Sequence, residues 1–135
     1  MNLKKFFLAF VVVFVVGFLL SFVIHGVMLH DDYSKLPNLL RTEQDAQGYF
    51  PYMILANVLY SLALVWIYAQ GVSAKPWLGQ GMRFGLAVWL LTAVPTYLIY
   101  YAVQPWPAVV ICKSIGFDLV RTTLIGVSAA AIYRK

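Results

Sequence analysis

The chain has 135 residues, of which 62% are hydrophobic and 11% are charged. A soluble globular domain is about 45–50% apolar and about 25% charged, so this composition predicts a membrane protein. Four membrane crossings of about 20 residues each would use about 80–90 positions. The remaining length excludes a separate soluble domain, and with it a nucleotide-binding fold, a large catalytic domain or an extended surface for nucleic acid.

The first hydrophobic run follows Lys4 and Lys5 and extends over about residues 6–29. A cleaved secretory signal has an apolar core of about 7–15 residues that ends in small residues. This run is longer, and it leads into the polar sequence of residues 30–32. We therefore expect an uncleaved membrane-spanning helix.

The next part of the chain, from His30 to Gly48, is polar and predicts one structured loop. Within it, residues 34–43 could form a short amphipathic helix on the bilayer surface. The stretch 70–81 contains several glycines and a proline and predicts a second loop. The remaining hydrophobic runs predict three further spanning helices, over about residues 50–69, 84–103 and 107–132.

The connection between the third and fourth helices is so short that these helices are expected to be antiparallel neighbours. The predicted fold is an all-α membrane protein, an antiparallel four-helix transmembrane bundle with one structured outward loop. The bundle is expected to form a single transmembrane domain over residues 1–135, with the lipid bilayer as its first partner.

The net charge of +5 is informative through its placement, because Lys and Arg residues near membrane helices are retained on the cytoplasmic side. Only Lys35 and Arg41 fall in the loop between the first and second helices. Six basic residues fall on the side of the N-terminus, namely Lys4, Lys5, Lys75, Arg83, Arg134 and Lys135. The count predicts a multi-pass protein of a bacterial-type inner membrane with both termini cytoplasmic.

Three charged residues lie within the fourth hydrophobic run: Lys113, Asp118 and Arg121. Such groups cost at least about 2.5–3.5 kcal/mol each to insert, so each needs a partner or an aqueous route. Asp118 and Arg121 share one helical stripe with Ser114, which predicts an ion pair that faces protein. Lys113 either extends to the outer interface or leans into the same polar region. We favour the second position for Lys113.

Polar residues of the other three helices are predicted at a similar depth, in the outer half of the membrane. They are His25 in the first helix, Asn57 in the second, and Thr96 or Tyr97 in the third. Pro95 is expected to kink the third helix beside these residues because proline has no backbone N–H. With the charged residues of the fourth helix, they form a candidate ligand-binding or partner-binding layer.

Three interpretations of this layer stay open at this point. Its charges can neutralise one another as structural contacts between helices. The layer can instead form a polar cavity for a ligand, an ion or a proton. It can also pair with polar groups of another membrane subunit.

No metal site or cofactor is expected from the pattern of His and Cys residues. His25 and His30 are five residues apart, whereas two ligands on one helical face need a spacing of four. Haem held between helices would require histidines on two different spanning helices, and no spanning helix after the first contains one. Cys112 is the single cysteine, and no CxxC motif or Cys/His cluster is present.

The sequence favours a non-enzymatic function, because no nucleophile–base pair or metal set can be assembled from it. We expect an accessory, assembly or self-associating subunit, within a larger membrane complex or a homo-oligomer. The alternative is a small ligand- or ion-binding transporter that uses the polar layer.

Overall fold

The structure is a computed structural model, and it describes residues 2–134. Over this range the chain is helical and contains no strand. Four of its helical segments are long and apolar enough to cross a membrane, namely Leu3–Met28, Phe50–Gly71, Trp77–Val103 and Ala108–Tyr133. The prediction of an all-α protein with four potential membrane spans is therefore confirmed.

The spanning segments are built from the following elements. The first consists of α1 (Leu3–Ser21) and a π-helical continuation, η1 (Phe22–Met28). Two one-turn helices follow, α2 (His30–Ser34) and α3 (Glu43–Gln47). The others are α4 (Phe50–Gly71), then α5 (Trp77–Leu91) with α6 (Ala93–Val103), and finally α7 (Ala108–Tyr133).

The segment between α2 and α3 differs from the expected surface helix over residues 34–43. Residues 35–42 form turns and irregular structure. Pro37 explains the difference, because proline has no N–H to donate and disfavours the helical conformation of the residue before it.

Local hydrogen bonds explain where the first spanning segment begins and how it ends. The side chain of Asn2 caps α1 by accepting a hydrogen bond from the backbone N–H of Lys5 at 3.1 Å. At the other end, the N–H of Leu29 donates to the carbonyl of Ile24 at 2.9 Å. This five-residue spacing is that of a π-helix, and the widened turn sets the direction in which His25 leaves the helix.

The third spanning segment is broken at Thr92, whose φ and ψ angles of −109° and −62° separate α5 from α6. Pro95 explains the break, because its ring clashes with the carbonyl of Leu91 four residues earlier. The Thr92 hydroxyl donates to the carbonyl of Val88 at 2.8 Å. The bend expected at Pro95 is therefore present.

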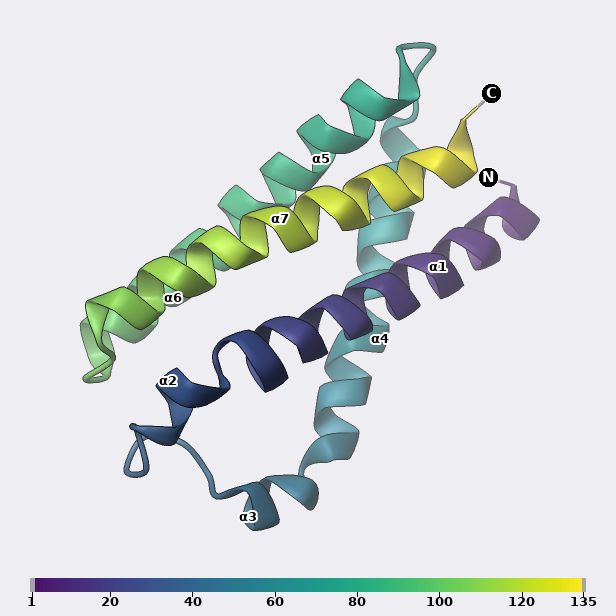
Figure 1. Cartoon of the computed structure of the whole chain (residues 1–135). Coiled ribbons are helices and arrows are strands. Elements are labelled where there is room, and N and C mark those ends of the chain that lie inside the picture. The colour runs from purple at the N-terminus through teal and green to yellow at the C-terminus, as the bar shows by residue number, and fades with distance from the viewer. Residues whose placement is uncertain (1, 135) are drawn as a thin grey trace.

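The helices are arranged around α7, which lies in the middle of the molecule (Figure 1). α5 and α6 pack along one side of α7, α1 packs along the other, and α4 packs chiefly on α1. The two chain ends and the turn before α5 lie at one end of the molecule, termed the terminal end. α2, α3 and the turn before α7 lie at the opposite end, termed the loop end.

The apolar core lies toward the terminal end, where all four spanning segments meet. Its buried members are Ala9, Val13, Leu64, Val65, Tyr68, Ile125, Ala129 and Ala130. The Tyr68 ring of α4 lies 5.1 Å from the Phe84 ring of α5 and 5.8 Å from the Tyr133 ring of α7. Through this core, the C-terminal half of α4 is fixed to the other helices.

The third spanning segment begins earlier than expected, because α5 starts at Trp77, inside the stretch 70–81 that was predicted to be a loop. That prediction is therefore wrong for residues 77–81, and also for residues 70–71, which are the last two residues of α4. The side-chain amide of Gln80, in the first turn of α5, donates to the hydroxyl of Ser73 at 2.7 Å. The Tyr68 hydroxyl donates to Oε1 of Gln80 at 3.1 Å.

Two of the three glycines of α5, Gly81 and Gly85, mark a helix contact and not a loop. A Cβ atom added at Gly81 would lie 2.8 Å from the carbonyl oxygen of Gly126 in α7. A Cβ atom added at Gly85 would lie 2.5 Å from the carbonyl oxygen of Thr122. The absence of side chains at these positions lets the backbones of α5 and α7 touch, as at small-residue interfaces of membrane helices.

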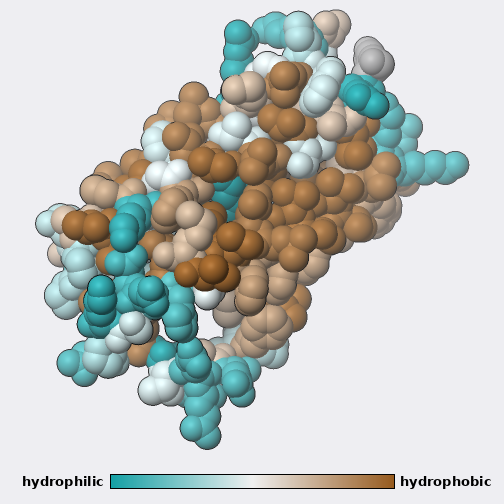
Figure 2. All heavy atoms as spheres, viewed as in Figure 1, coloured by the Kyte–Doolittle hydropathy of each residue, from teal (hydrophilic) through white to brown (hydrophobic). Residues whose placement is uncertain are grey.

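Hydrophobic side chains form a broad band across the middle of the molecule, while hydrophilic side chains gather at its two ends (Figure 2). Large apolar side chains exposed on the spanning segments include Leu19, Phe22, Leu59, Trp66, Leu91 and Leu98. Soluble monomers rarely expose contiguous apolar surface of this extent. The distribution fits a protein whose middle contacts the hydrocarbon of a bilayer.

Candidate functional site

A cleft of about 1010 Å³ lies between the first spanning segment and α4. It forms because α4, which joins the core through its C-terminal half, diverges from α1 toward α3 (Figure 1). Most of its lining is apolar, including Phe18, Phe22, Leu36, Leu40, Phe50 and Met53. Ligand pockets are commonly about 300–1,000 Å³, so the cleft is large enough to hold a small molecule.

Arg121 of α7 forms part of a polar floor within this cleft. Its side chain is only 14% exposed. The Nε atom donates to the carbonyl of Gly17 in α1 at 3.4 Å, and the guanidinium carbon lies 5.3 Å from the centre of the Tyr60 ring in α4. Arg121 therefore extends from α7 to the two helices that form the walls of the cleft.

Asn57 and Tyr60 of α4 complete the polar floor. They are three residues apart, so they share one face of α4, and both line the cleft. Nδ2 of Asn57 and the hydroxyl of Tyr60 are buried, and neither has a hydrogen-bond partner among residues 2–134. An unsatisfied buried polar group costs about 1–3 kcal/mol, so a small shift of either side chain toward an acceptor bound in the cleft would be favourable.

Asp118 of α7 lies behind Arg121. It is not among the residues that line the cleft in the described part of the chain. Its Oδ1 atom lies 3.9 Å from Nη1 of Arg121, so the predicted ion pair is present. A charge-assisted hydrogen bond would be about 2.7–2.9 Å long, so the pair leaves the guanidinium free to bind a further acceptor. Tyr97 of α6 lies within electrostatic range of the Asp118 carboxylate.

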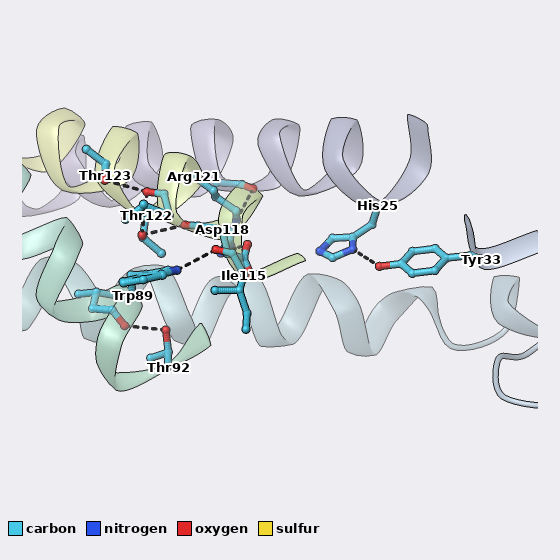
Figure 3. A network of polar contacts seen from close by, with 12 residues as sticks. His25, Tyr33, Trp89, Thr92, Ile115, Asp118, Arg121, Thr122 and Thr123 are labelled. Atoms are coloured by element: carbon cyan, nitrogen blue, oxygen red, sulfur yellow. Dashed lines mark hydrogen bonds and ion pairs between the residues drawn. The ribbon is translucent and has the colours of Figure 1, made fainter. Parts of the chain in front are cut away.

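His25 of η1 forms one side of the cleft together with Tyr33 of α2. Nδ1 of His25 and the Tyr33 hydroxyl form a hydrogen bond of 2.6 Å (Figure 3). The two rings stack at 6.0 Å, and the Trp106 ring packs edge-on against Tyr33 at 6.2 Å. Burial raises the pKa of Tyr33 to about 12, so its hydroxyl is neutral at physiological pH.

The structure divides most of the predicted polar layer into two groups and places Thr96 outside both. His25, Asn57 and Arg121 line the cleft. Asp118 and Tyr97 lie near one another behind the polar floor. Thr96 is exposed and takes no part in either group, so the third helix contributes Tyr97 to the layer.

Lys113 does not join the layer, and the expected position beside Asp118 is wrong. Its Nζ atom lies 2.9 Å from Oδ2 of Asp32 in α2, and its side chain is 43% exposed. Lys113 lies on a different face of α7 from the buried Ser114, so its long side chain reaches the loop end, where Asp32 provides an anion. The ion pair attaches α2 to α7.

Three aromatic residues near the site were missed by sequence reasoning. Tyr60 had a usable signal, because it lies one helical turn after Asn57 on the same face. Tyr33 had none, because its contact with His25 depends on the π-helical turn of η1. Trp89 of α5 donates from Nε1 to the carbonyl of Ile115 in α7 at 2.8 Å, and this contact also depends on packing (Figure 3).

Within residues 2–134, no group of three or more His, Cys, Asp or Glu side chains is placed to hold a metal ion. Comparison of the chain with protein-family models, with curated proteins and with solved structures finds no match. The functional assignment therefore depends on the geometry of the cleft.

Proposed function

We propose that this protein binds a small ligand within the membrane, in the cleft between α1 and α4. A single observation carries the proposal: the cleft has room for a molecule, and buried donors on its floor, at Asn57 and Tyr60, lack partners in the described chain. Native proteins satisfy nearly all buried polar groups. A small shift of these side chains would bring the donors to the acceptor atoms of a bound molecule.

The proposed arrangement in the membrane is an antiparallel bundle with both termini cytoplasmic, in a bacterial-type inner membrane. The distribution of basic residues supports this orientation, because six of them lie in the sequence near the two chain ends or near the turn before α5. The segment between η1 and α4 is then an outward loop. In this orientation the cleft lies in the outward half of the bundle, and the protein could present or transfer its ligand there.

A partner helix is the second candidate for the occupant, and it corresponds to an accessory or self-associating subunit. The observation that favours it is the shape of the cleft, which runs between two spanning helices and has mainly apolar walls. A helix from another chain would cover these walls. It would satisfy the donors of the floor only if it carried an acceptor at their depth.

The test fills the cleft with a bulky side chain. Ala56 lines the cleft, whereas Leu59 is 58% exposed on α4 and lies outside the lining, so Ala56→Trp and Leu59→Trp are matched variants. Each is reconstituted with lipids extracted from the expressing membranes, and bound species are identified by native mass spectrometry. We expect wild type and Leu59→Trp to retain a small molecule that Ala56→Trp loses.

Equal retention by all three proteins, or no retained molecule in any of them, would contradict ligand binding in the cleft. Loss of a stoichiometric protein from Ala56→Trp, in place of a small molecule, would instead support the accessory-subunit function.

A further inference from the structure

We infer that the ligand is an anionic amphiphile, with headgroup oxygens at Arg121 and a hydrocarbon part against the apolar walls of the cleft. This inference rests on the proposed function and names the chemical class of the ligand. Two features of the cleft carry it, the polar floor and the apolar lining.

The polar floor offers mainly hydrogen-bond donors. A guanidinium group has five N–H donors and no acceptor. Of these, only Nε of Arg121 has a hydrogen-bond acceptor among residues 2–134, the carbonyl of Gly17. Nδ2 of Asn57 adds two N–H donors, and the hydroxyl of Tyr60 adds one more. A matching headgroup must therefore present several acceptor oxygens close together, as a carboxylate or a phosphate does.

The member of the Asp118–Arg121 pair that faces the cleft is the cation. Arg121 lines the cleft, whereas Asp118 does not, and the 3.9 Å separation of the two side chains is too long for a charge-assisted hydrogen bond. In a medium of low dielectric constant, a guanidinium binds an anionic oxygen more strongly than a neutral one. A headgroup with a negative charge is therefore favoured over an alcohol with the same chain.

The apolar lining indicates that the ligand also carries a hydrocarbon part. Phenylalanine side chains from two helices, Phe18, Phe22 and Phe50, face the cleft with Met53. Leu36 and Leu40 line it from the turns between α2 and α3. A small hydrophilic anion would leave these side chains uncovered, whereas an alkyl chain would cover them.

The experiment measures displacement of a fluorescent long-chain fatty acid from the full-length protein in detergent. The competitors are an unlabelled fatty acid, an alkyl phosphate and a fatty alcohol of equal chain length, and inorganic phosphate alone. We expect the two anionic amphiphiles to displace the probe roughly tenfold better than the alcohol, because their hydrogen bonds to Arg121 are charge-assisted. Inorganic phosphate alone should not displace it.

Two variants connect the preference to Arg121. In Asp118→Asn/Arg121→Gln both charges are removed together, so no unpaired charge is left buried, and the preference for anionic competitors should disappear. In Lys113→Gln a cation of the same helix is removed outside the cleft, and the preference should persist.

The outcomes distinguish this inference from the proposed function. Equal displacement by acid and alcohol in the wild type would overturn the anionic headgroup and leave ligand binding intact. Displacement by inorganic phosphate alone would overturn the amphiphile. If the probe binds equally well to wild type and to Ala56→Trp, the cleft is not the site and the proposed function itself fails. If the probe binds to neither protein while wild type still retains a small molecule that Ala56→Trp loses, the anionic amphiphile is overturned and the proposed function stands.

Discussion

Among individual residues, Asp118 and Arg121 carry the largest electrostatic consequence, because both charges lie inside a membrane-spanning helix. Their side chains are 11% and 14% exposed, so neither has ready access to water. Removing one partner leaves an unpaired buried charge, which typically costs about 3–5 kcal/mol. Removing both leaves no charge to solvate.

We therefore predict that Asp118→Asn and Arg121→Gln each lower the melting temperature in detergent more than the double substitution does. Thermal unfolding of the four proteins under identical conditions measures the coupling. A double substitution whose loss equals the sum of the two single losses would show that the side chains act independently.

Tyr33 yields a prediction about alkaline pH. Burial raises the pKa of its hydroxyl from 10.0 to about 12. Between these values the folded protein keeps a proton that the unfolded chain has lost, so the stabilising contribution of Tyr33 is complete below pH 10 and declines as the pH rises toward 12. The difference in phenolate absorbance between wild type and Tyr33→Phe should have its midpoint near pH 12.

The control for this titration is Tyr52→Phe, which removes a tyrosine that is 68% exposed. A midpoint near 10.0 for the Tyr33 difference would contradict the burial of its hydroxyl.

The sequence was sufficient to predict some of these residues and insufficient for others, and chain separation explains the difference. Asp118 and Arg121 are three residues apart, so helix geometry alone pairs them. Lys113 pairs with Asp32, which is 81 residues away, and no local pattern indicates that contact. The cleft itself depends on the divergence of α4 from α1, which is a property of packing and has no local signal.

At the scale of elements, the contact of α5 with α7 requires glycine at defined positions. A Cβ atom at Gly85 would lie 2.5 Å from the carbonyl oxygen of Thr122. A Cβ atom at Gly79, in the same helix, would meet nothing within 4 Å. Gly85→Ala should destabilise the protein by about 1–3 kcal/mol through overpacking. Gly79→Ala should be neutral or stabilise it by up to about 1 kcal/mol, because alanine favours a helix.

The measurement is thermal unfolding of both glycine variants in detergent. Equal stability of the two would show that α5 and α7 are not in backbone contact.

The same glycines show why composition misled the prediction of element boundaries. In a soluble chain, clustered glycines commonly indicate a loop. In a membrane helix, small residues commonly indicate close packing with a neighbour. The four long hydrophobic runs were predictable, because bilayer thickness sets the length that a spanning segment needs. The start of α5 was not, because the meaning of its glycines depends on α7.

At the scale of the whole molecule, the orientation in the membrane is open to a direct test. In a Cys112→Ala background, Ser34→Cys introduces a thiol in α2, at the loop end, and Ser73→Cys introduces one in the turn before α5, at the terminal end (Figure 1). With the termini cytoplasmic, a membrane-impermeant thiol reagent applied to intact cells should label Ser34→Cys and not Ser73→Cys. Labelling of Ser73→Cys alone would reverse the proposed orientation.

The central position of α7 also has a consequence for biogenesis. α1 is synthesised first, yet the helix along which it packs, α7, is the last of the spanning segments to be synthesised. α5 likewise has its most extensive contact with α7. During translation α1 and α5 must therefore wait without their main neighbour, whereas α4 can already pack on α1, and the arrival of α7 brings these helices together in a late step. A ribosome that stalls before α7 would leave in the membrane a set of helices that quality-control proteases can recognise as unassembled.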